Sequence, residues 1–251
     1  MKADWLHPAW KVSSRVQAVT TTRASGSSVG PYAHFNLAAH VGDHRAAVDG
    51  NRVSLREATG CRRIQWLDQM HGNRIVHVCD ESALTVPRAD GAWTENPGIG
   101  LAVLTADCLP VVVCDISGFL VGIAHAGWRG LVDGVLQNLV EQMPVESRNL
   151  SAWIGPGIGG AVYEVGRDVA EAVDALGLAG DLQAQVMRPG NRPGKFLFDM
   201  GPLAEWILKA SGVRDVAVVS GCCTYRDERF YSYRRDGTTG RMATLVWLLP
   251  S

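Results

Sequence analysis

The sequence lacks a hydrophobic run long enough to cross a membrane. Its longest apolar stretch, residues 99–113, is interrupted by Asp107 and is shorter than the roughly 20 residues that a bilayer-spanning helix needs. Residues 1–5 contain an early acidic side chain and no apolar core, so we expect no signal peptide. These absences predict a cytoplasmic protein that does not bind a membrane.

An excess of charge of either sign is also absent. The chain has 24 Lys and Arg and 25 Asp and Glu, which gives a formal net charge of −1. Nucleic acids and anionic membranes attract clustered basic side chains, so neither is an expected partner. The composition, with 47% hydrophobic and 20% charged residues, is typical of a folded protein. We expect residues 1–251 to form a single domain.

The cysteines are too few and too scattered to predict a disulfide framework. Six occur in 251 residues, and the adjacent pair Cys222 and Cys223 is poorly placed for ordinary bridging. We therefore expect free thiols, as in a reducing cytoplasm. Cys61, Cys79 and Cys114 are most simply buried small apolar side chains. A free thiol elsewhere is a candidate metal ligand or nucleophile.

Strand-like and helical patterns alternate along the chain. We expect strands over residues 17–22, 74–78, 101–106, 111–114, 120–124, 151–154, 196–200, 216–219 and 243–248. We expect helices over residues 45–59, 131–143, 168–176 and 202–210. Several strands are continuously apolar, which is typical of strands covered on both faces. The predicted fold class is mixed α/β (α+β), one layered domain with a mixed β-sheet flanked by helices.

Three side chains of types that can bind a metal lie at predicted strand ends beside Gly or Pro, with a structural role for each as the alternative. His71 precedes the strand at 74–78, Cys108 interrupts an apolar run, and His125 lies just before the helix at 131. Two imidazoles and one thiolate suit a catalytic zinc whose fourth position holds water. Such an ion lowers the pKa of its water to about 7. Asp107 is a candidate to orient a ligand, and Asp107, Cys108 and His125 are the candidate catalytic residues.

The residues around these three donors closely resemble the YfiH family, also called the laccase-domain or polyphenol-oxidase-like family. The matching segments are QMHG at 69–72, TADCLP at 105–110, HAGWRG at 125–130, and further stretches at 36–43, 154–165 and 233–242. They occur in family order and cover nearly the whole chain from about residue 20. The resemblance implies that the family's metal ligands fall on His71, Cys108 and His125. It also implies purine nucleoside phosphorylase activity, with adenosine deaminase and methylthioadenosine phosphorylase activity in the same family.

Two positions depart from the family pattern. Gly157 stands in a turn where the family often has cysteine, so any thiol chemistry at that position is missing from this chain. Ala38 and Ala39 stand where a glycine is common, so we expect the loop at 36–43 to have a different shape.

The predicted partners are a nucleoside and phosphate. Arg129 is the candidate phosphate clamp, because a guanidinium fork can hold two oxygens and this one lies in the His125 motif; the alternative is a structural salt bridge. Metal-bound water attacking purine C6 would instead be deamination. Asn36, His40 and Asp43 are candidates for substrate contact, with organisation of their loop as the alternative.

A glycine-rich segment and an arginine-rich segment are less specific. Residues 155–160 satisfy G-x-G-x-x-G, but no helix opens directly on those glycines, so we predict a tight loop lining the pocket and not a dinucleotide site. Arg234, Arg235 and Arg241 flank an Asp-Gly turn at 236–237. We expect a solvated hairpin there, with contact to an anionic ligand as the alternative.

A Cys–His hydrolase is a different function that the same residues would allow. Cys108 and His125 would then be nucleophile and base. The family is similar in fold to the cytotoxic necrotizing factor toxins, which use such a pair, and some members are linked to peptidoglycan-precursor editing. His71 distinguishes the two hypotheses, because a dyad does not need it and a three-ligand site does.

The identity and role of the metal give two more hypotheses. A copper-dependent phenol oxidase is suggested by the family's older name, but the seven histidines form no His-x-His pair. Cys and two His can still bind one Cu²⁺ in place of Zn²⁺. A non-enzymatic module with structural zinc would need a fourth protein ligand, for which Asp107 and His77 are the nearby options.

Overall fold

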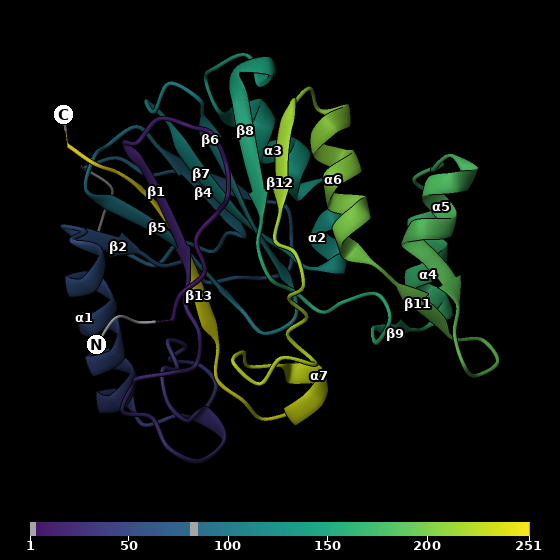
Figure 1. Ribbon diagram of the computed structural model, residues 1–251, viewed down its shortest axis with the longest axis horizontal. Coiled ribbons are helices and arrows are strands. Elements are labelled where there is room, and N and C mark those ends of the chain that lie inside the picture. Colours follow the sequence, from purple (N-terminus) through teal and green to yellow (C-terminus); the bar gives the residue numbers. More distant parts are fainter. Residues whose placement is uncertain (1–3, 81–84, 251) are drawn as a thin grey trace.

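The computed structural model describes residues 4–80 and 85–250, in which two β-sheets pack face to face (Figure 1). The larger sheet has the strand order β12-β8-β6-β7-β4-β3 and the smaller has the order β1-β13-β5-β2. The larger sheet contains β3 (Ile75–His77), β4 (Gly91–Thr94), β6 (Leu109–Asp115), β7 (Val121–Ala126), β8 (Leu150–Ile154) and β12 (Asp215–Val218). The smaller contains β1 (Val16–Thr20), β2 (Arg63–Gln65), β5 (Ile99–Thr105) and β13 (Met242–Leu248). Parallel and antiparallel pairs occur in both, so both sheets are mixed.

The alternation of side chains along β5 shows why its sequence is apolar from Ile99 to Leu104. Leu101 and Val103 belong to the core between the sheets, together with Ile123 of β7. Ala102 and Leu104 point to the other side of the smaller sheet and belong to a separate core. Because successive side chains of a strand face opposite sides, a strand covered on both faces needs apolar residues at every position.

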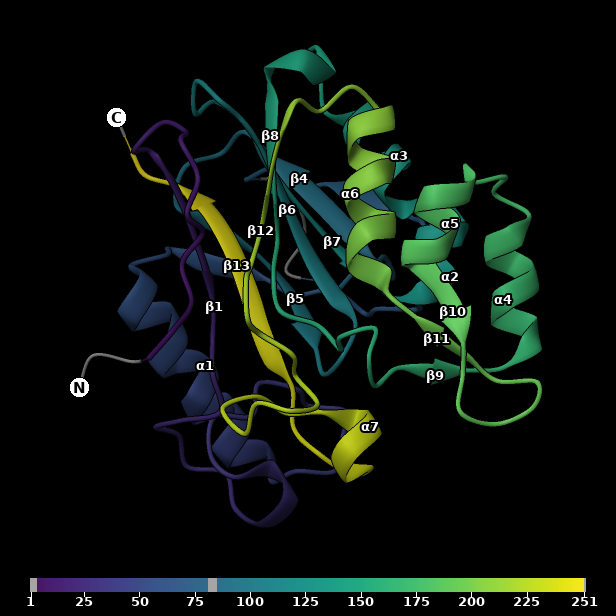
Figure 2. The same ribbon diagram turned by 45° about the vertical axis from the view of Figure 1, so that its right-hand side comes forward.

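Helices cover the outer face of each sheet. α1 (Arg45–Thr59) lies on the smaller sheet, where Leu55 enters its outer core. α3 (Val135–Gln142) and α6 (Met200–Ala210) cover the larger sheet, and Leu139 is fully buried there. The result is a four-layer α/β/β/α arrangement (Figures 1 and 2). The predicted mixed α/β class is confirmed, with two packed sheets in place of one.

A third, small sheet lies to one side of the layers and has the order β10-β11-β9 (Figure 2). Its elements and the neighbouring helices are β9 (Glu164–Val165), α4 (Arg167–Asp174), α5 (Gly180–Val186), β10 (Met187–Pro189) and β11 (Phe196–Phe198). The remaining short helices are η1 (Gly30–Tyr32), α2 (Trp128–Val132), η2 (Ser147–Asn149) and α7 (Tyr233–Asp236). Within the described part of the chain, no helix is both long and apolar enough to span a bilayer.

Three predicted elements were wrong in detail. The helix at 131–143 is two helices, α2 and α3, divided at Gly134, whose φ of 88° favours glycine. The strand at 196–200 ends at Phe198, because Asp199 caps α6 by accepting from the N–H of Gly201. The hairpin expected at 236–237 is the short helix α7, whose N-cap side chain is Ser232.

Candidate metal centre

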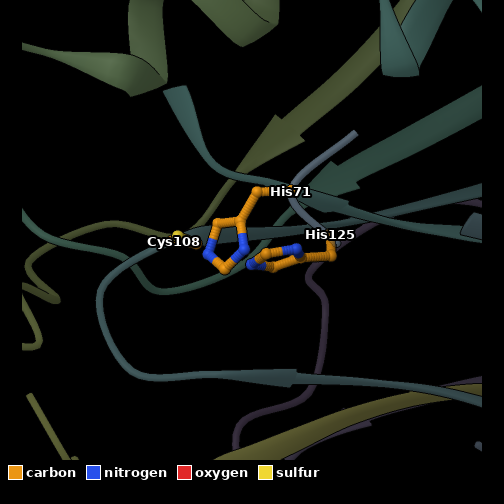
Figure 3. A group of neighbouring side chains, drawn as sticks. All are labelled: His71, Cys108 and His125. Atoms are coloured by element: carbon orange, nitrogen blue, oxygen red, sulfur yellow. The ribbon is translucent and has the colours of Figure 1, made fainter. Parts of the chain in front are cut away.

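The three predicted metal ligands converge at one end of the larger sheet. His71 lies in the loop before β3, Cys108 immediately precedes β6, and His125 is in β7. The antiparallel register of β6 and β7 pairs Pro110 with His125, so Cys108 starts close to that imidazole. One ligand atom from each residue lies within 4.8 Å of the others (Figure 3). The strand ends thus bring together donors that are far apart in the sequence.

A buried carboxylate, Asp90, fixes the orientation of His125. The register of β4 and β7 pairs Gly91 with Ala124, which places Asp90 beside His125. The backbone N–H of His125 donates to the Asp90 carbonyl at 2.7 Å, and its Nδ1 lies 2.9 Å from Asp90 Oδ1. An ionised carboxylate can only accept, so Nδ1 carries a proton, and Nε2 is the nitrogen that would bind a metal.

The same carboxylate holds the loop that carries His71. Its oxygens accept the backbone N–H groups of Met70 at 3.0 Å, His71 at 2.9 Å and Gly72 at 2.8 Å. Asp90 is only 1% exposed. Burial opposes its ionisation, but hydrogen bonds from His125 and from the backbone of Gly72 and Met70 hold its pKa below the ordinary value. One side chain therefore positions two of the three donors.

Sequence reasoning assigned the orienting role to Asp107 and missed Asp90. The carboxylate of Asp107 accepts from Thr224 Oγ1 and from the backbone N–H of Arg234, each at 2.7 Å. Asp107 thus braces the loop before Cys108 against α7, and it is Asp90 that contacts a ligand ring. Because Asp90 reaches His125 through strand pairing, no local spacing in the sequence indicates the contact.

The donors form an electrostatically coupled group. Burial raises the pKa of the Cys108 thiol, but the charge of His125 and hydrogen bonds from His125 and His71 outweigh it and lower the pKa to about 6. Burial lowers the pKa of His125, but Cys108 and Asp90 raise it to about 9. The geometry therefore favours a thiolate, the form of cysteine that binds metal.

The donor set fits zinc. A tetrahedral ion with Zn–N near 2.0 Å and Zn–S near 2.3 Å holds its donor atoms roughly 3.5 Å apart. The three donor atoms here lie within 4.8 Å of one another, so small side-chain movements would bring them to that spacing. His125 is buried, Cys108 is half-buried and His71 is exposed. The group is thus open on one side, as a catalytic site requires.

Gly127 allows the donors to approach one another. A Cβ atom at this position would lie 3.0 Å from Cys108 Sγ and 3.3 Å from His71 Cδ2. Both distances are tighter than ordinary van der Waals contact, so any larger residue would displace a ligand.

The donors open into a cavity of about 400 Å³, within the range of small-molecule sites. Its walls also include His40, Asp68, Gln69, Thr105, Asp107, Trp128, Arg129, Ile158, Tyr163, Tyr233, Arg234 and Arg241. Ile158 comes from the glycine-rich loop at 155–160, and the next helix, α4, begins only at Arg167. The loop at 155–160 therefore contributes to the cavity wall and does not open a helix.

The three loop residues predicted to contact substrate have different positions. His40 lines the cavity. Asn36 is fully buried, and its Nδ2 donates to Asp43 Oδ2 at 2.9 Å while its Oδ1 accepts the backbone N–H of Arg241 at 2.9 Å. Asn36 and Asp43 therefore organise the loop, the alternative left open by the sequence.

Tyr163 lines the cavity and was not singled out from the sequence, whereas Arg234 and Arg241 line it as the anion-contact alternative allows. Arg129 is exposed and stacks on the Trp128 ring at 4.6 Å. Across the described residues, its guanidinium forms no ion pair with a carboxylate, so the salt-bridge alternative is not observed. Burial, followed by the charge of Cys108, raises the pKa of Tyr163 to about 12.

The position that departs from the family turn is tightly enclosed. A Cβ at Gly157 would lie 2.5 Å from Leu109 Cδ2 and 2.9 Å from the Asp107 carbonyl oxygen. Gly157 forms a parallel β-bridge with Cys223, whose Sγ accepts the N–H of Gly159 at 3.2 Å. Packing in this chain therefore requires glycine at position 157. Cys61 and Cys114 are buried as expected, whereas Cys79 is only half-buried.

Sequence comparison places the chain among bacterial relatives of its own length. The family model described as multi-copper polyphenol oxidoreductase laccase matches residues 17–249. A Pseudomonas aeruginosa protein named purine nucleoside phosphorylase is 45% identical over 246 residues, covering 97% of this chain and 98% of that protein. The Escherichia coli purine nucleoside phosphorylase YfiH is 40% identical, with 96% and 98% covered.

Solved structures of similar proteins share the fold over nearly the whole chain. A crystal structure of Neisseria meningitidis protein NMB0706 matches with a TM-score of 0.91 at 40% identity, covering 98% of this chain and all of that one. Geobacillus stearothermophilus YlmD matches with a TM-score of 0.90 at 32% identity, covering 100% and 98%.

Proposed function

This chain belongs to the YfiH, or laccase-domain, family, and on that premise we propose that it is a zinc-dependent purine nucleoside phosphorylase. The observation that carries the proposal is the His71–Cys108–His125 group opening into a cavity of about 400 Å³ that is also lined by arginine. Relatives at 37–45% identity that bear the name purine nucleoside phosphorylase support it. We extend the proposal to adenosine deaminase and methylthioadenosine phosphorylase activity at the same site.

Five residues at or beside the cavity have roles in the proposed reaction. His71, Cys108 and His125 would hold the zinc ion, which supplies a Lewis acid and a bound water of lowered pKa. Asp90 keeps the proton of His125 on Nδ1 and holds the His71 loop. Arg129, whose guanidinium has no carboxylate partner among the described residues, would bind phosphate with its fork.

The proposed partners are therefore a purine nucleoside and inorganic phosphate. We do not expect binding to nucleic acid or to a membrane, in line with the net charge of −1. A cytoplasmic location is part of the proposal, and it is supported by the scattered spacing of the six cysteines, which matches no disulfide framework.

The deciding experiment combines metal analysis of the purified protein with nucleoside turnover in the presence and absence of phosphate. Phosphate-dependent release of free purine, together with about one zinc per chain, is the expected result. Release of ammonia without phosphate would show deamination instead. A protein that carries metal but releases neither base nor ammonia from any purine nucleoside would contradict the proposal.

A Cys–His hydrolase is the second candidate, favoured by the Cys108 pKa of about 6 beside His125. Iodoacetamide separates the two. A metal ligand should be alkylated only after chelation, and chelation should abolish activity; a nucleophile should be alkylated at once, with activity insensitive to chelator. A copper phenol oxidase is less well supported, because the described residues form one three-donor group and a multicopper site needs more.

A further inference from the structure

Three arginines in the segment 234–241 have different surroundings. Arg235 is a structural residue: its Nε lies 2.8 Å from Asp236 Oδ1, and its Nη atoms donate to the carbonyls of Thr224 and Phe230 at 2.8 Å. Arg234 and Arg241 instead line the cavity. Among the residues that the structure describes, neither forms an ion pair with a carboxylate.

Arg241 is held in place from several directions. Its backbone N–H donates to Asn36 Oδ1 at 2.9 Å, and its carbonyl accepts the N–H of Leu37 at 3.3 Å. Its Nη1 donates to the carbonyls of Thr239 at 2.9 Å and Gly240 at 3.0 Å. The side chain is thus oriented before any ligand arrives, which lowers the entropy that binding must oppose.

The guanidinium of Arg241 has no carboxylate in direct contact among the described residues. The side chain is half-buried, and burial lowers its pKa while Cys108 and Asp107 act in the opposite direction. A guanidinium removed from water is stable when it meets a carboxylate or another anion. Two carbonyl groups occupy only one of its nitrogens, so the remaining N–H groups are available to a ligand.

Arg234 adds a second guanidinium from the same side of the cavity. Its backbone N–H donates to Asp107 Oδ2, and its Nη1 donates to the carbonyl of Glu164 at 2.7 Å. Its guanidinium also stacks on the Tyr163 ring at 4.9 Å. Asp107 precedes the ligand Cys108, so this helix and the metal loop are tied together.

We propose that Arg241, assisted by Arg234, binds the phosphate that enters the cavity, which makes the α7–β13 side of the cavity an anion site in addition to Arg129. This inference rests on the proposed function for the identity of the anion. The same chemistry would recognise a phosphoryl group carried by the substrate, so free phosphate and a nucleoside monophosphate are the two sources to distinguish.

The test measures phosphate binding by isothermal titration calorimetry with no nucleoside present. Arg241→Gln should weaken binding by about tenfold or more, since a hydrogen bond to a charged group is lost. The phosphate affinity of Arg241→Lys should lie between that of the unmodified protein and that of Arg241→Gln, because an ammonium group keeps the positive charge but cannot donate two parallel hydrogen bonds. Arg52→Gln is the matched control: Arg52 is also half-buried, stacks on Trp66 at 4.1 Å and donates to the Leu37 carbonyl, but it does not line the cavity.

The control separates anion binding from damage to the loop. Arg52→Gln should bind phosphate as the unmodified protein does, and thermal unfolding should show that all variants are folded. The inference is overturned if Arg241→Gln binds phosphate normally, or if Arg52→Gln loses as much affinity as Arg241→Gln.

A parallel titration with adenosine and adenosine 5′-monophosphate identifies the source of the anion. Arg241-dependent binding of the monophosphate, with phosphate binding unchanged, would keep an anion site but contradict free phosphate as its ligand. Arg241-dependent phosphate binding in a protein that phosphorolyses no nucleoside would refute the proposed function and leave the anion site standing.

Discussion

The two sides of the cavity are built in different ways. The metal side lies where β6 and β7 pair, and a single carboxylate, Asp90, joins two of its donors. The arginine side lies where α7, the start of β13 and the loop at 36–43 meet, and side chain–backbone hydrogen bonds hold it. The metal side thus depends on sheet register, and the arginine side depends on contacts between loops distant in the sequence.

The two sides of the cavity also differ in charge. The metal side has a cysteine whose pKa is lowered towards the thiolate, Cys108, and a buried carboxylate, Asp90, and both favour a cation. The arginine side carries Arg234 and Arg241, which have no carboxylate partner in the described part of the chain and favour an anion. A site that would hold a metal ion and an oxyanion together would use both sides of the cavity.

Removal of a metal ligand should have the largest effect, and it should act on the metal side alone. We expect Cys108→Ala to lose bound zinc and to lower activity by more than about 100-fold. That factor is the upper end of the range for mutating residues that only hydrogen-bond to a metal ligand. Phosphate binding should remain. Zinc content and calorimetry measure the two sides separately.

The matched control is Cys114→Ala, because Cys114 is a buried cysteine outside the cavity. It should keep one zinc per chain. Full zinc content in Cys108→Ala would remove this residue from the ligand set.

The second largest effect should follow from Asp90→Asn. The amide has one accepting oxygen in place of two, so it cannot satisfy the N–H groups of His71 and Gly72 and also fix His125. We expect zinc affinity to fall by about 10- to 100-fold and the free energy of unfolding to fall by about 1–3 kcal/mol. Competition with a chelator measures the affinity.

Asp115→Asn provides the comparison, since Asp115 is also buried and accepts a backbone N–H, from Phe119. This variant should lose stability and keep its zinc affinity. Equal zinc affinities in the two variants would show that Asp90 has a structural role only.

The metal donors were candidates because they are chemically distinctive and sit at strand ends next to Gly or Pro, and the resemblance of their motifs to the YfiH family selected them as a set. Asp90 was not identified from the sequence, because it lies in an Ala-Asp-Gly segment that resembles a turn. The strand that follows, β4, is short and begins with glycine, so it was not predicted either. The long helix α1 was placed at residues 45–59 from its apolar spacing. The same spacing runs through α2 and α3, and it cannot reveal the break that Gly134 introduces.

The sequence left two alternatives open for the arginine side, for a different physical reason. Three arginines around an Asp-Gly pair match a solvated turn as well as a binding surface. Arg235 proved structural and Arg241 proved to face the cavity, a distinction made by carbonyl groups and by Asn36, which is remote in the sequence. Local pattern carries no information about such contacts.

A smaller effect is expected from Gly127→Ala. The added Cβ would lie 3.0 Å from Cys108 Sγ, so the ligand must move by a few tenths of an ångström. We expect zinc affinity to fall by roughly tenfold, the lower end of the range for residues that position ligands. Gly180→Ala is the control, because a Cβ there meets nothing and alanine favours the start of α5. Unchanged zinc affinity in Gly127→Ala would show that the donors can adjust.

The smallest effect on the chemistry should follow from Asn36→Ala, which tests whether the two sides are independent. The change leaves the buried N–H groups of Ala38 and Arg241 without an acceptor, so the free energy of unfolding should fall by about 1–3 kcal/mol. Arg241 loses one constraint but keeps its bonds to the Thr239 and Gly240 carbonyls, so phosphate affinity should fall only a few-fold, on the order of one weakened hydrogen bond. Zinc affinity should not change, because no hydrogen bond of Asn36 reaches Asp90 or the three donors. If Asn36→Ala also lost zinc affinity in chelator competition, the loop at 36–43 would support both sides of the cavity. The conclusion that the metal side and the arginine side are independent would then be wrong.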